Sequence, residues 1–253
     1  MKTIAISLQK GGTGKTSLAV TLAAELSTYG DTVLIDADPQ GNASAWIGTQ
    51  ALKAELAGVL LKKYALDNAV IKTQTQGLSL LPSAGLDGQL KVFVEQMASA
   101  EPFCMQDIIS ELAGFNYKYA VIDLSPSFGT FEREALTASD EVITPIMPDP
   151  FCVDGIEIFS ANIIDARQKM HTDKPLYSKI VINALDNRIK QHSQIVSDMK
   201  DKAKGLKLYL IPVDQVFRRS QTTHQTIQST GNAKAETLET IKILARDLTE
   251  AFK

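Results

Sequence analysis

Residues 9–16, which read QKGGTGKT, constrain the fold of this chain more than any other segment. The apolar, β-rich run Thr3–Leu8 precedes them, and a helix-forming run begins at Lys15. Glycines between a strand and a helix let backbone N–H groups approach phosphate oxygens, and the helix N-terminus adds its positive dipole end. The pattern therefore predicts a phosphate-binding loop, in which Lys15 reaches the β- and γ-phosphates and Thr16 ligates Mg²⁺.

Short apolar runs alternate with longer amphipathic runs along the rest of the chain. The predicted strands are Thr3–Leu8, Thr32–Asp36, Leu78–Pro82, Tyr119–Leu124, Glu141–Ile146, Lys179–Asn183 and Lys207–Ile211. The clearest predicted helices are Lys15–Thr28, Leu90–Ala98, Met105–Ala113, Phe151–Lys169, His192–Lys202 and Ala233–Phe252. This alternation predicts an α/β fold, with a mostly parallel twisted sheet of about seven or eight strands and helices on both faces. Together with the phosphate-binding loop at residues 9–16, it indicates a fold of the P-loop NTPase type. No repeat or linker divides the chain, so we expect a single domain over residues 1–253.

Composition narrows the functional classes. No apolar stretch is long enough for a membrane span, and the N-terminus does not have the regions of a signal peptide, so we expect a cytoplasmic protein. Two cysteines, Cys104 and Cys152, are too few for a disulfide framework or a zinc site, and we expect free, buried thiols.

The net charge is −3, but residues 179–220 hold nine basic and four acidic side chains. That segment carries +5 and the remainder −8, which allows a local basic surface on an acidic molecule.

Carboxylates lie at the ends of two of the predicted strands. Asp36 and Asp38 end one apolar run, and Asp123 ends another. Ligands of open α/β sheets bind at the carboxyl ends of the strands, so all three side chains are expected at the binding edge. Pro39 indicates a fixed turn after Asp38. Asp123 has the Walker B arrangement, in which a buried carboxylate holds a magnesium-bound water.

Three ordered motifs resemble those of the ParA/MinD superfamily. Lys10 stands five residues before Lys15, as in the deviant Walker A motif of that superfamily. Residues 36–42 read DADPQGN, similar to the family's DxDPQGN, and residues 145–155 resemble its PxxxxxFAxxG stretch, which helps to build the dimer face. Residues 123–127 read DLSPS where the family usually has DTPPS, a departure that leaves Asp123 in place.

The resemblance implies roles for individual residues. Lys10 would cross a dimer interface to the partner's nucleotide, although taken alone it could be a solvated loop charge. Asp38 would position or deprotonate the attacking water, and Asp36 would support the magnesium shell alongside Thr16 and Asp123. The nucleotide-binding set would be Lys10, Gly11, Gly12, Thr13, Gly14, Lys15, Thr16, Ser17 and Asn183. Asn183 corresponds to a position that contacts the adenine edge. Residues 183–186 form a partial NKxD guanine motif in which Ala184 replaces the lysine, so ATP is preferred over GTP.

The resemblance further implies a ParA-like partition ATPase of the short type, without an N-terminal helix-turn-helix domain. Such a protein forms a homodimer with ATP, binds double-stranded DNA non-specifically and associates with the nucleoid. Its Mg²⁺-dependent hydrolysis is slow alone and is stimulated by a ParB-like centromere-binding protein during plasmid or chromosome segregation. One alternative is a MinD-like membrane ATPase, but residues 234–253 hold four basic and four acidic side chains and are expected to pack on the sheet. The other is a nucleotide-switched scaffold with negligible turnover.

Non-specific DNA binding requires basic side chains on one face, because the contacts are to phosphates. The candidates are Arg188, Lys190, Arg218 and Arg219. Arg218 and Arg219 lie in the region where the family has an arginine after its IPxxxR stretch. Lys200, Lys202, Lys204 and Lys207 either form a solvated helix face or provide the alternative DNA surface.

Overall fold

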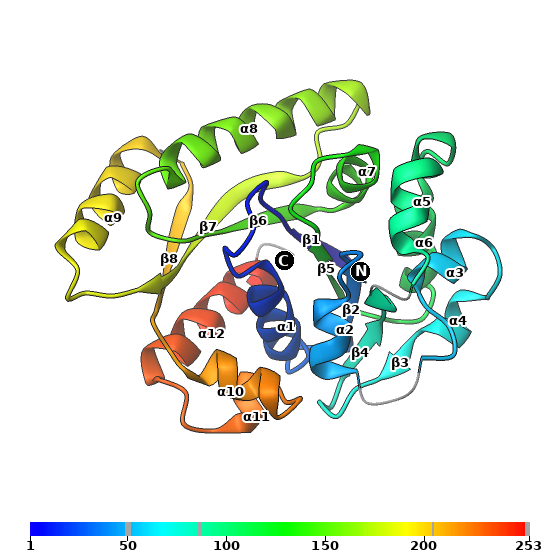
Figure 1. Cartoon of the computed structure of the whole chain (residues 1–253), viewed down its shortest axis with the longest axis horizontal. Helices are drawn as coiled ribbons and strands as arrows, with labels where there is room; N and C mark the ends of the chain where they lie inside the picture. Colours follow the sequence, from blue (N-terminus) through cyan, green and yellow to red (C-terminus); the bar gives the residue numbers. More distant parts are fainter. Residues whose placement is uncertain (49–51, 86–87, 204, 251–253) are drawn as a thin grey trace.

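The computed structural model describes residues 1–48, 52–85, 88–203 and 205–250. Its centre is an eight-stranded sheet, twisted and covered by helices on both sides (Figure 1). The strands are β1 (Lys2–Ile6), β2 (Thr32–Ala37), β3 (Ile71–Lys72), β4 (Leu78–Leu81), β5 (Tyr119–Leu124), β6 (Glu141–Ile146), β7 (Leu176–Leu185) and β8 (Lys207–Pro212). Their spatial order is β3-β4-β2-β5-β1-β6-β7-β8, and only the β3–β4 pair is antiparallel.

Helices fill the connections between the strands. The longer ones are α1 (Lys15–Leu26), α6 (Cys104–Ala113), α7 (Thr130–Ala138), α8 (Cys152–Lys169), α9 (Lys190–Lys202) and α12 (Ala235–Glu250). The shorter ones are α2 (Asn42–Ile47), α3 (Leu56–Leu60), α4 (Leu66–Ala69), α5 (Leu90–Gln96), the 3₁₀ turn η2 (Ala98–Ala100), α10 (Val216–Thr222) and α11 (Ile227–Thr230).

Each central strand is buried on both faces, and its side chains alternate between two apolar clusters. Ile4 and Ile6 of β1 pack with α1, α2 and α12, whereas Ala5 packs with the helices of the opposite face. In Figure 1, α1, α2 and α12 lie on one side of the sheet, and α7, α8 and α9 lie on the other. This double coverage explains why the strand sequences read as nearly continuous apolar runs.

The predicted α/β fold is confirmed. All seven predicted strands are present, with ends shifted by a few residues, and the short antiparallel β3 is the eighth. The prediction of the helices was incomplete, because it omitted α7 and several short helices. Residues 130–138 read TFEREALTA, in which buried Glu132 and Glu134 interrupt the apolar periodicity of a helix.

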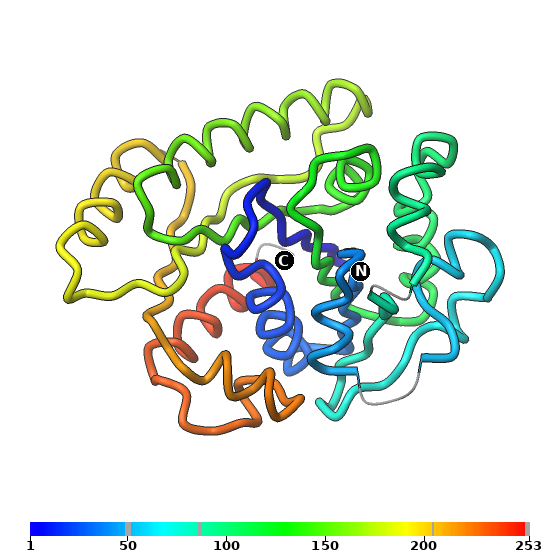
Figure 2. Tube along the Cα trace, in the orientation of Figure 1, coloured from blue at the N-terminus to red at the C-terminus, as the bar shows by residue number. Residues whose placement is uncertain are grey.

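The last described helix, α12, lies beside α1 near the start of the chain (Figure 2). Lys2 Nζ donates to the Leu248 carbonyl of α12 at 2.9 Å and pairs with the buried carboxylate of Glu141 at 3.2 Å. The apolar side of α12, including Ile241 and Leu244, is buried against the sheet, as predicted; the expected final position, Phe252, lies outside the described residues. Across the described ranges, no helix is both long and apolar enough to span a bilayer.

Candidate functional site

The loop between β1 and α1 is folded around the side chain of Lys15. Gly12 and Gly14 have φ values of 72° and 92°, a left-handed conformation that glycine adopts without steric cost. Gly14 caps α1, so the first free N–H groups of the helix lie beside the loop. Lys15 Nζ turns back and donates to the Lys10 carbonyl at 2.8 Å, and the residue is 7% exposed. Residues 9–16 therefore form a cradle, with the Lys15 ammonium group at its centre and the free N–H groups of α1 beside it.

The Lys15 ammonium is poorly solvated in this cradle. Burial lowers the pKa of Lys15, and the nearby carboxylates of Asp123 and Asp38 act in the opposite direction. A phosphate anion at this position would replace the missing hydration of the ammonium. Together with the helix N-terminus, the side chain makes the cradle a site for a phosphorylated ligand.

Lys10 points away from the same cradle. Its Nζ lies 2.5 Å from the Asp149 carboxylate in the β6–α8 loop, and its side chain is 43% exposed. The adjacent Gln9 accepts a hydrogen bond from Asn162 of α8 at 2.5 Å. The two lysines of the loop are thus oriented differently, one toward the cradle and one toward the surface near α8.

Asp36 and Asp123 are opposite one another on the neighbouring parallel strands β2 and β5. Asp36 is fully buried and accepts from the backbone N–H and the hydroxyl of Ser44, at 2.7 and 2.6 Å. Burial raises the pKa of Asp36 to about 7, and these hydrogen bonds lower it only in part. Asp36 therefore links α2 to the carboxyl end of β2 through its hydrogen bonds with Ser44, and it lies next to Asp123 at the predicted metal site.

Asp123 is also fully buried, but neither of its carboxylate oxygens has a hydrogen-bond partner. Burial raises its pKa well above the ordinary value, and the negative charges of Asp36 and Asp38 add to this. The Lys15 ammonium and the Thr16 hydroxyl oppose it; the hydroxyl is near Asp123 but forms no hydrogen bond of ordinary geometry with it. A buried carboxylate without donors is a costly arrangement that a cation would relieve. The two free oxygens therefore fit the predicted role of Asp123 toward Mg²⁺.

Whether this site fits Mg²⁺ depends on how many ligands the protein itself must supply. The described ranges contain no group of three or more His, Cys, Asp or Glu side chains suited to holding a metal ion. Mg²⁺ usually keeps several waters and is bound by one or two protein groups plus substrate phosphates, so such a group is not required. The Thr16 hydroxyl and Asp123 would hold the ion next to a bound phosphate chain, where it would neutralise developing negative charge.

Asp38 lies in a tight turn at the end of β2. Its Oδ1 accepts from the Gln40 N–H at 2.9 Å, and its carbonyl accepts from the Gly41 N–H at 2.9 Å. The turn predicted from Pro39 is therefore present, and α2 begins only at Asn42. Asp38 is 7% exposed, so its carboxylate is held in a fixed position near Lys15.

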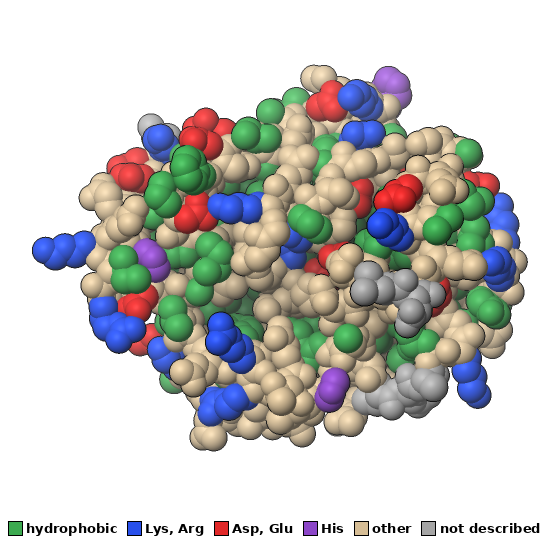
Figure 3. Space-filling view, viewed as in Figure 1, with side chains coloured by type: hydrophobic (Ala, Val, Ile, Leu, Met, Phe, Trp, Pro, Cys, Tyr) green, Lys and Arg blue, Asp and Glu red, His purple; other side chains and the backbone are tan. Residues whose placement is uncertain are grey.

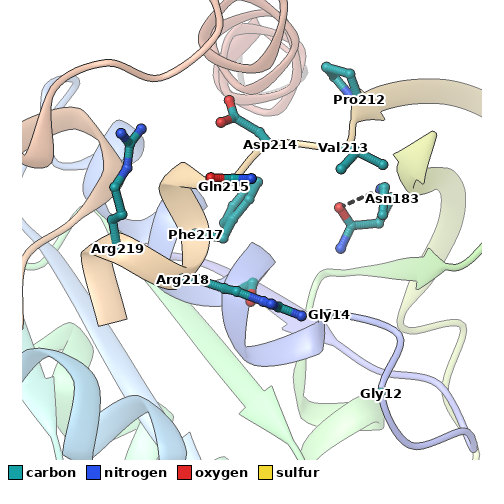
Figure 4. Close-up of a pocket in the computed structure, with 12 residues that line it drawn as sticks. Gly12, Gly14, Asn183, Pro212, Val213, Asp214, Gln215, Phe217, Arg218 and Arg219 are labelled. Atoms are coloured by element: carbon teal, nitrogen blue, oxygen red, sulfur yellow. Dashed lines mark hydrogen bonds between the residues drawn. The ribbon is translucent and has the colours of Figure 1, made fainter. Parts of the chain in front are cut away.

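A cavity of about 610 Å³ opens beside the cradle (Figure 4). Its walls come from the loop, the end of β7 and the segment after β8, with lining residues that include Gly12, Gly14, Ser17, Asn183, Phe217 and Arg218. Asn183 Nδ2 donates to the Thr13 carbonyl at 3.4 Å, and its Oδ1 accepts from the Ala184 N–H at 2.9 Å. A Cβ added to Gly14 would lie 2.1 Å from Asn183 Nδ2, so a side chain at this position would displace Asn183.

The predicted DNA-binding residues have different surroundings. Arg188 is exposed and pairs with Asp186 at 2.6 Å, and Lys190 is exposed at the start of α9. Arg218 and Arg219 are both exposed and both line the cavity, and Arg219 also donates to the Asn232 carbonyl at 3.0 Å. Basic side chains gather at the lower left of Figure 3, over the region from α9 to α10. Of the alternative lysines, Lys207 pairs with Asp247, and Lys204 lies outside the described residues.

The structure adds residues that the motifs did not indicate. Glu132 is completely buried and accepts from the hydroxyls of Ser125 and Ser127 and from the Gly129 N–H, at 2.6, 2.5 and 2.9 Å. These bonds fix the loop that follows Asp123. A glutamate three residues after a helix cap could have indicated this role. No sequence signal marked Ser44 or Asp149. Both cysteines are free as predicted, but Cys104 is only half-buried and donates to Glu134.

Known proteins resemble this chain in sequence and in fold. Residues 1–176 match the AAA domain family. The chromosome partitioning protein ParA of Caulobacter vibrioides is 31% identical over 79% of this chain and 76% of its own length. A McdA variant from Cyanothece in complex with ATP has a TM-score of 0.85 at 19% identity, covering 98% of this chain and 96% of its own. MinD from Pyrococcus horikoshii, complexed with Mg-ADP, has a TM-score of 0.79 at 21% identity, covering 99% and 96%.

Proposed function

This chain belongs to the ParA/MinD superfamily of ATPases, and we propose that it is a ParA-type partition ATPase that binds DNA as an ATP-dependent dimer. In this proposal it hydrolyses ATP slowly alone, faster with a ParB-like centromere-binding partner, and acts on the nucleoid during plasmid or chromosome segregation. The relative from Caulobacter vibrioides is named for chromosome partitioning, which supports this role over other roles in the superfamily.

The observation that carries the proposal is the opposite orientation of the two loop lysines. Lys15 is buried within the cradle of its own subunit, where it can bind the phosphates of its own nucleotide. Lys10 points to the surface, where it forms an exposed ion pair with Asp149. A lysine in this position is free to reach the nucleotide of a second subunit across a two-fold axis. The two nucleotides would then lie at the dimer interface.

The chain's own residues supply the groups that hydrolysis of a terminal phosphate requires. Asp38 orients the attacking water and accepts its proton. Lys15, and Lys10 from the partner, stabilise the charge that develops on the transferred phosphoryl group. The carboxylates of Asp123 and Asp36 lie at the same sheet edge, where Asp123 supports Mg²⁺ binding.

DNA binding would use the basic side chains from the end of β7 to α10. Arg188, Lys190, Arg218 and Arg219 are exposed there, on a chain whose overall charge is −3. One subunit presents few such groups and would bind weakly, because salt screens exposed charges. A dimer presents two copies, so that the second contact becomes intramolecular and the affinity rises.

The C-terminal helix α12 argues against a membrane-binding role, because its apolar side is buried within the protein. Its apolar residues, including Ile241, Leu244 and Leu248, are buried against the sheet and α1. They are therefore not available to insert into a lipid surface.

The test measures DNA binding and ATP turnover with no nucleotide, ADP, ATP and a non-hydrolysable analogue. We expect tight binding to duplexes of any sequence only with ATP or the analogue. Asp38→Ala should keep ATP-dependent DNA binding and lose turnover by about 100-fold or more, because a positioned base matters chiefly in the transition state. Turnover of this variant within about threefold of the parent, or equal DNA binding with and without ATP, would contradict the proposal.

A further inference from the structure

Arg218 faces the cavity beside the phosphate cradle. It lies on α10 next to Phe217, and both residues line the cavity together with Arg219, Gly14 and Ser17. In Figure 4 the Arg218 side chain extends from α10 toward Gly14. The neighbouring Arg219 extends away from the loop, and its guanidinium donates to the Asn232 carbonyl. Successive arginines of one helix thus face different surroundings.

The Arg218 guanidinium has no hydrogen-bond or ion-pair partner within the part of the chain that the structure describes. The one acidic residue that lines the same cavity, Asp214, does not neutralise it. The two oxygens of Asp214 accept from the N–H groups of Val216 and Lys234 and from the hydroxyl of Thr237, at 2.8–3.0 Å. The cavity therefore combines a free guanidinium with the positive N-terminal end of α1.

The lining residues show which end of a nucleotide Arg218 could contact. Asp36, Asp38 and Asp123 do not line the cavity, and neither does Lys15. The cavity extends instead from Gly14 and Ser17 to Asn183 and the segment after β8. It thus lies beside the cradle, away from the groups assigned to the terminal phosphate and Mg²⁺. A phosphate chain bound in the cradle would enter the cavity with its sugar-proximal end.

We propose that Arg218 binds the sugar-proximal end of the phosphate chain, and so contacts the bound nucleoside diphosphate or triphosphate rather than DNA. A guanidinium donates two parallel hydrogen bonds to a phosphate and suits this role better than a lysine. The contact is equally available with ADP and with ATP. It therefore strengthens binding of both nucleotides without acting on the transition state. This inference rests on the proposed nucleotide-dependent function.

The test is direct titration of ADP and of a non-hydrolysable ATP analogue into the parent protein, Arg218→Ala and Arg218→Lys. Arg218→Ala is expected to weaken binding of both nucleotides by the same factor, about 10- to 100-fold, as is typical of a hydrogen bond to a charged group. Arg218→Lys should recover part of the affinity. Arg246→Ala removes an exposed arginine from α12 and is the matched control. It should bind both nucleotides as the parent does.

The two proposals fail in different ways. If the parent does not bind ADP, the proposed function is wrong. If the parent binds ADP and Arg218→Ala binds it within twofold of the parent, the assignment of Arg218 alone is overturned. A loss confined to the triphosphate analogue would also overturn it, because that result places Arg218 at the terminal phosphate. Thermal unfolding without nucleotide should be unchanged in Arg218→Ala, which separates loss of a ligand contact from loss of the fold.

Discussion

Asp123→Asn should stabilise the nucleotide-free protein, although it removes a residue proposed for function. Asp123 is fully buried, its two oxygens have no donor, and Asp36 and Asp38 lie nearby. A buried, unsatisfied polar group costs about 1–3 kcal/mol, and a charged one costs more. The isosteric amide is neutral and supplies its own donor. For a chain of this size, the gain corresponds to a rise in Tm of roughly 2–12 °C.

The gain in stability of Asp123→Asn should depend on pH in a defined direction. The pKa of Asp123 is raised in the folded state, so the folded protein holds this proton more tightly than the unfolded chain does. The stability of the parent therefore falls as pH rises above the ordinary value of 3.8, until the folded pKa is passed. The slope is at most about 1.4 kcal/mol per pH unit. Because Asn does not titrate, the advantage of the variant should be larger at pH 8 than at pH 5.5.

Thermal and urea unfolding in EDTA, without nucleotide, measure this effect across the pH range. Asp173→Asn replaces an exposed carboxylate and should change neither the midpoint nor its pH dependence. Added Mg²⁺ and ATP should stabilise the parent strongly and Asp123→Asn weakly. An Asp123→Asn variant that is less stable than the parent at pH 8, or a gain independent of pH, would refute this account of the site.

Two further carboxylates, Asp149 and Glu141, give predictions of opposite sign. Asp149→Asn removes the exposed partner of Lys10. Because such pairs contribute about 0.2–1 kcal/mol, ATP-dependent association should tighten by up to about fivefold for each Lys10 released, as measured by sedimentation. Weaker association would show that Asp149 is needed to place Lys10. Glu141→Gln leaves the buried ammonium groups of Lys2 and Lys179 without their carboxylate and should cost about 3–5 kcal/mol in urea unfolding. A cost below about 1 kcal/mol would contradict the inferred burial of these charges.

The sequence predicted those parts of the site that depend on position along a strand. Asp36 and Asp123 end apolar runs, and the ends of parallel strands meet at one edge, so their proximity followed from the pattern alone. The loop geometry around Lys15 followed from the steric freedom of Gly12 and Gly14.

Side-chain direction and long-range partners could not be predicted in this way. Arg218 and Arg219 are adjacent in sequence, and only the position of α10 over the loop determines which one extends toward Gly14 and which one donates to the Asn232 carbonyl. The bond from Ser44 to Asp36 depends on the turn that starts α2, and the pair of Lys10 with Asp149 joins residues 139 positions apart. Contacts of this kind are set by tertiary packing, which leaves no periodic signal in the sequence.

The most direct test of the central claim is the association state of the protein with no nucleotide, ADP and ATP, measured by sedimentation for the parent, Lys10→Ala and Lys15→Ala. The account predicts a parent dimer with ATP alone, a Lys10→Ala variant that binds ATP but stays monomeric, and a Lys15→Ala variant that does not bind ATP. A Lys10→Ala variant that dimerises with ATP as the parent does would contradict the assignment of Lys10 to the partner's nucleotide.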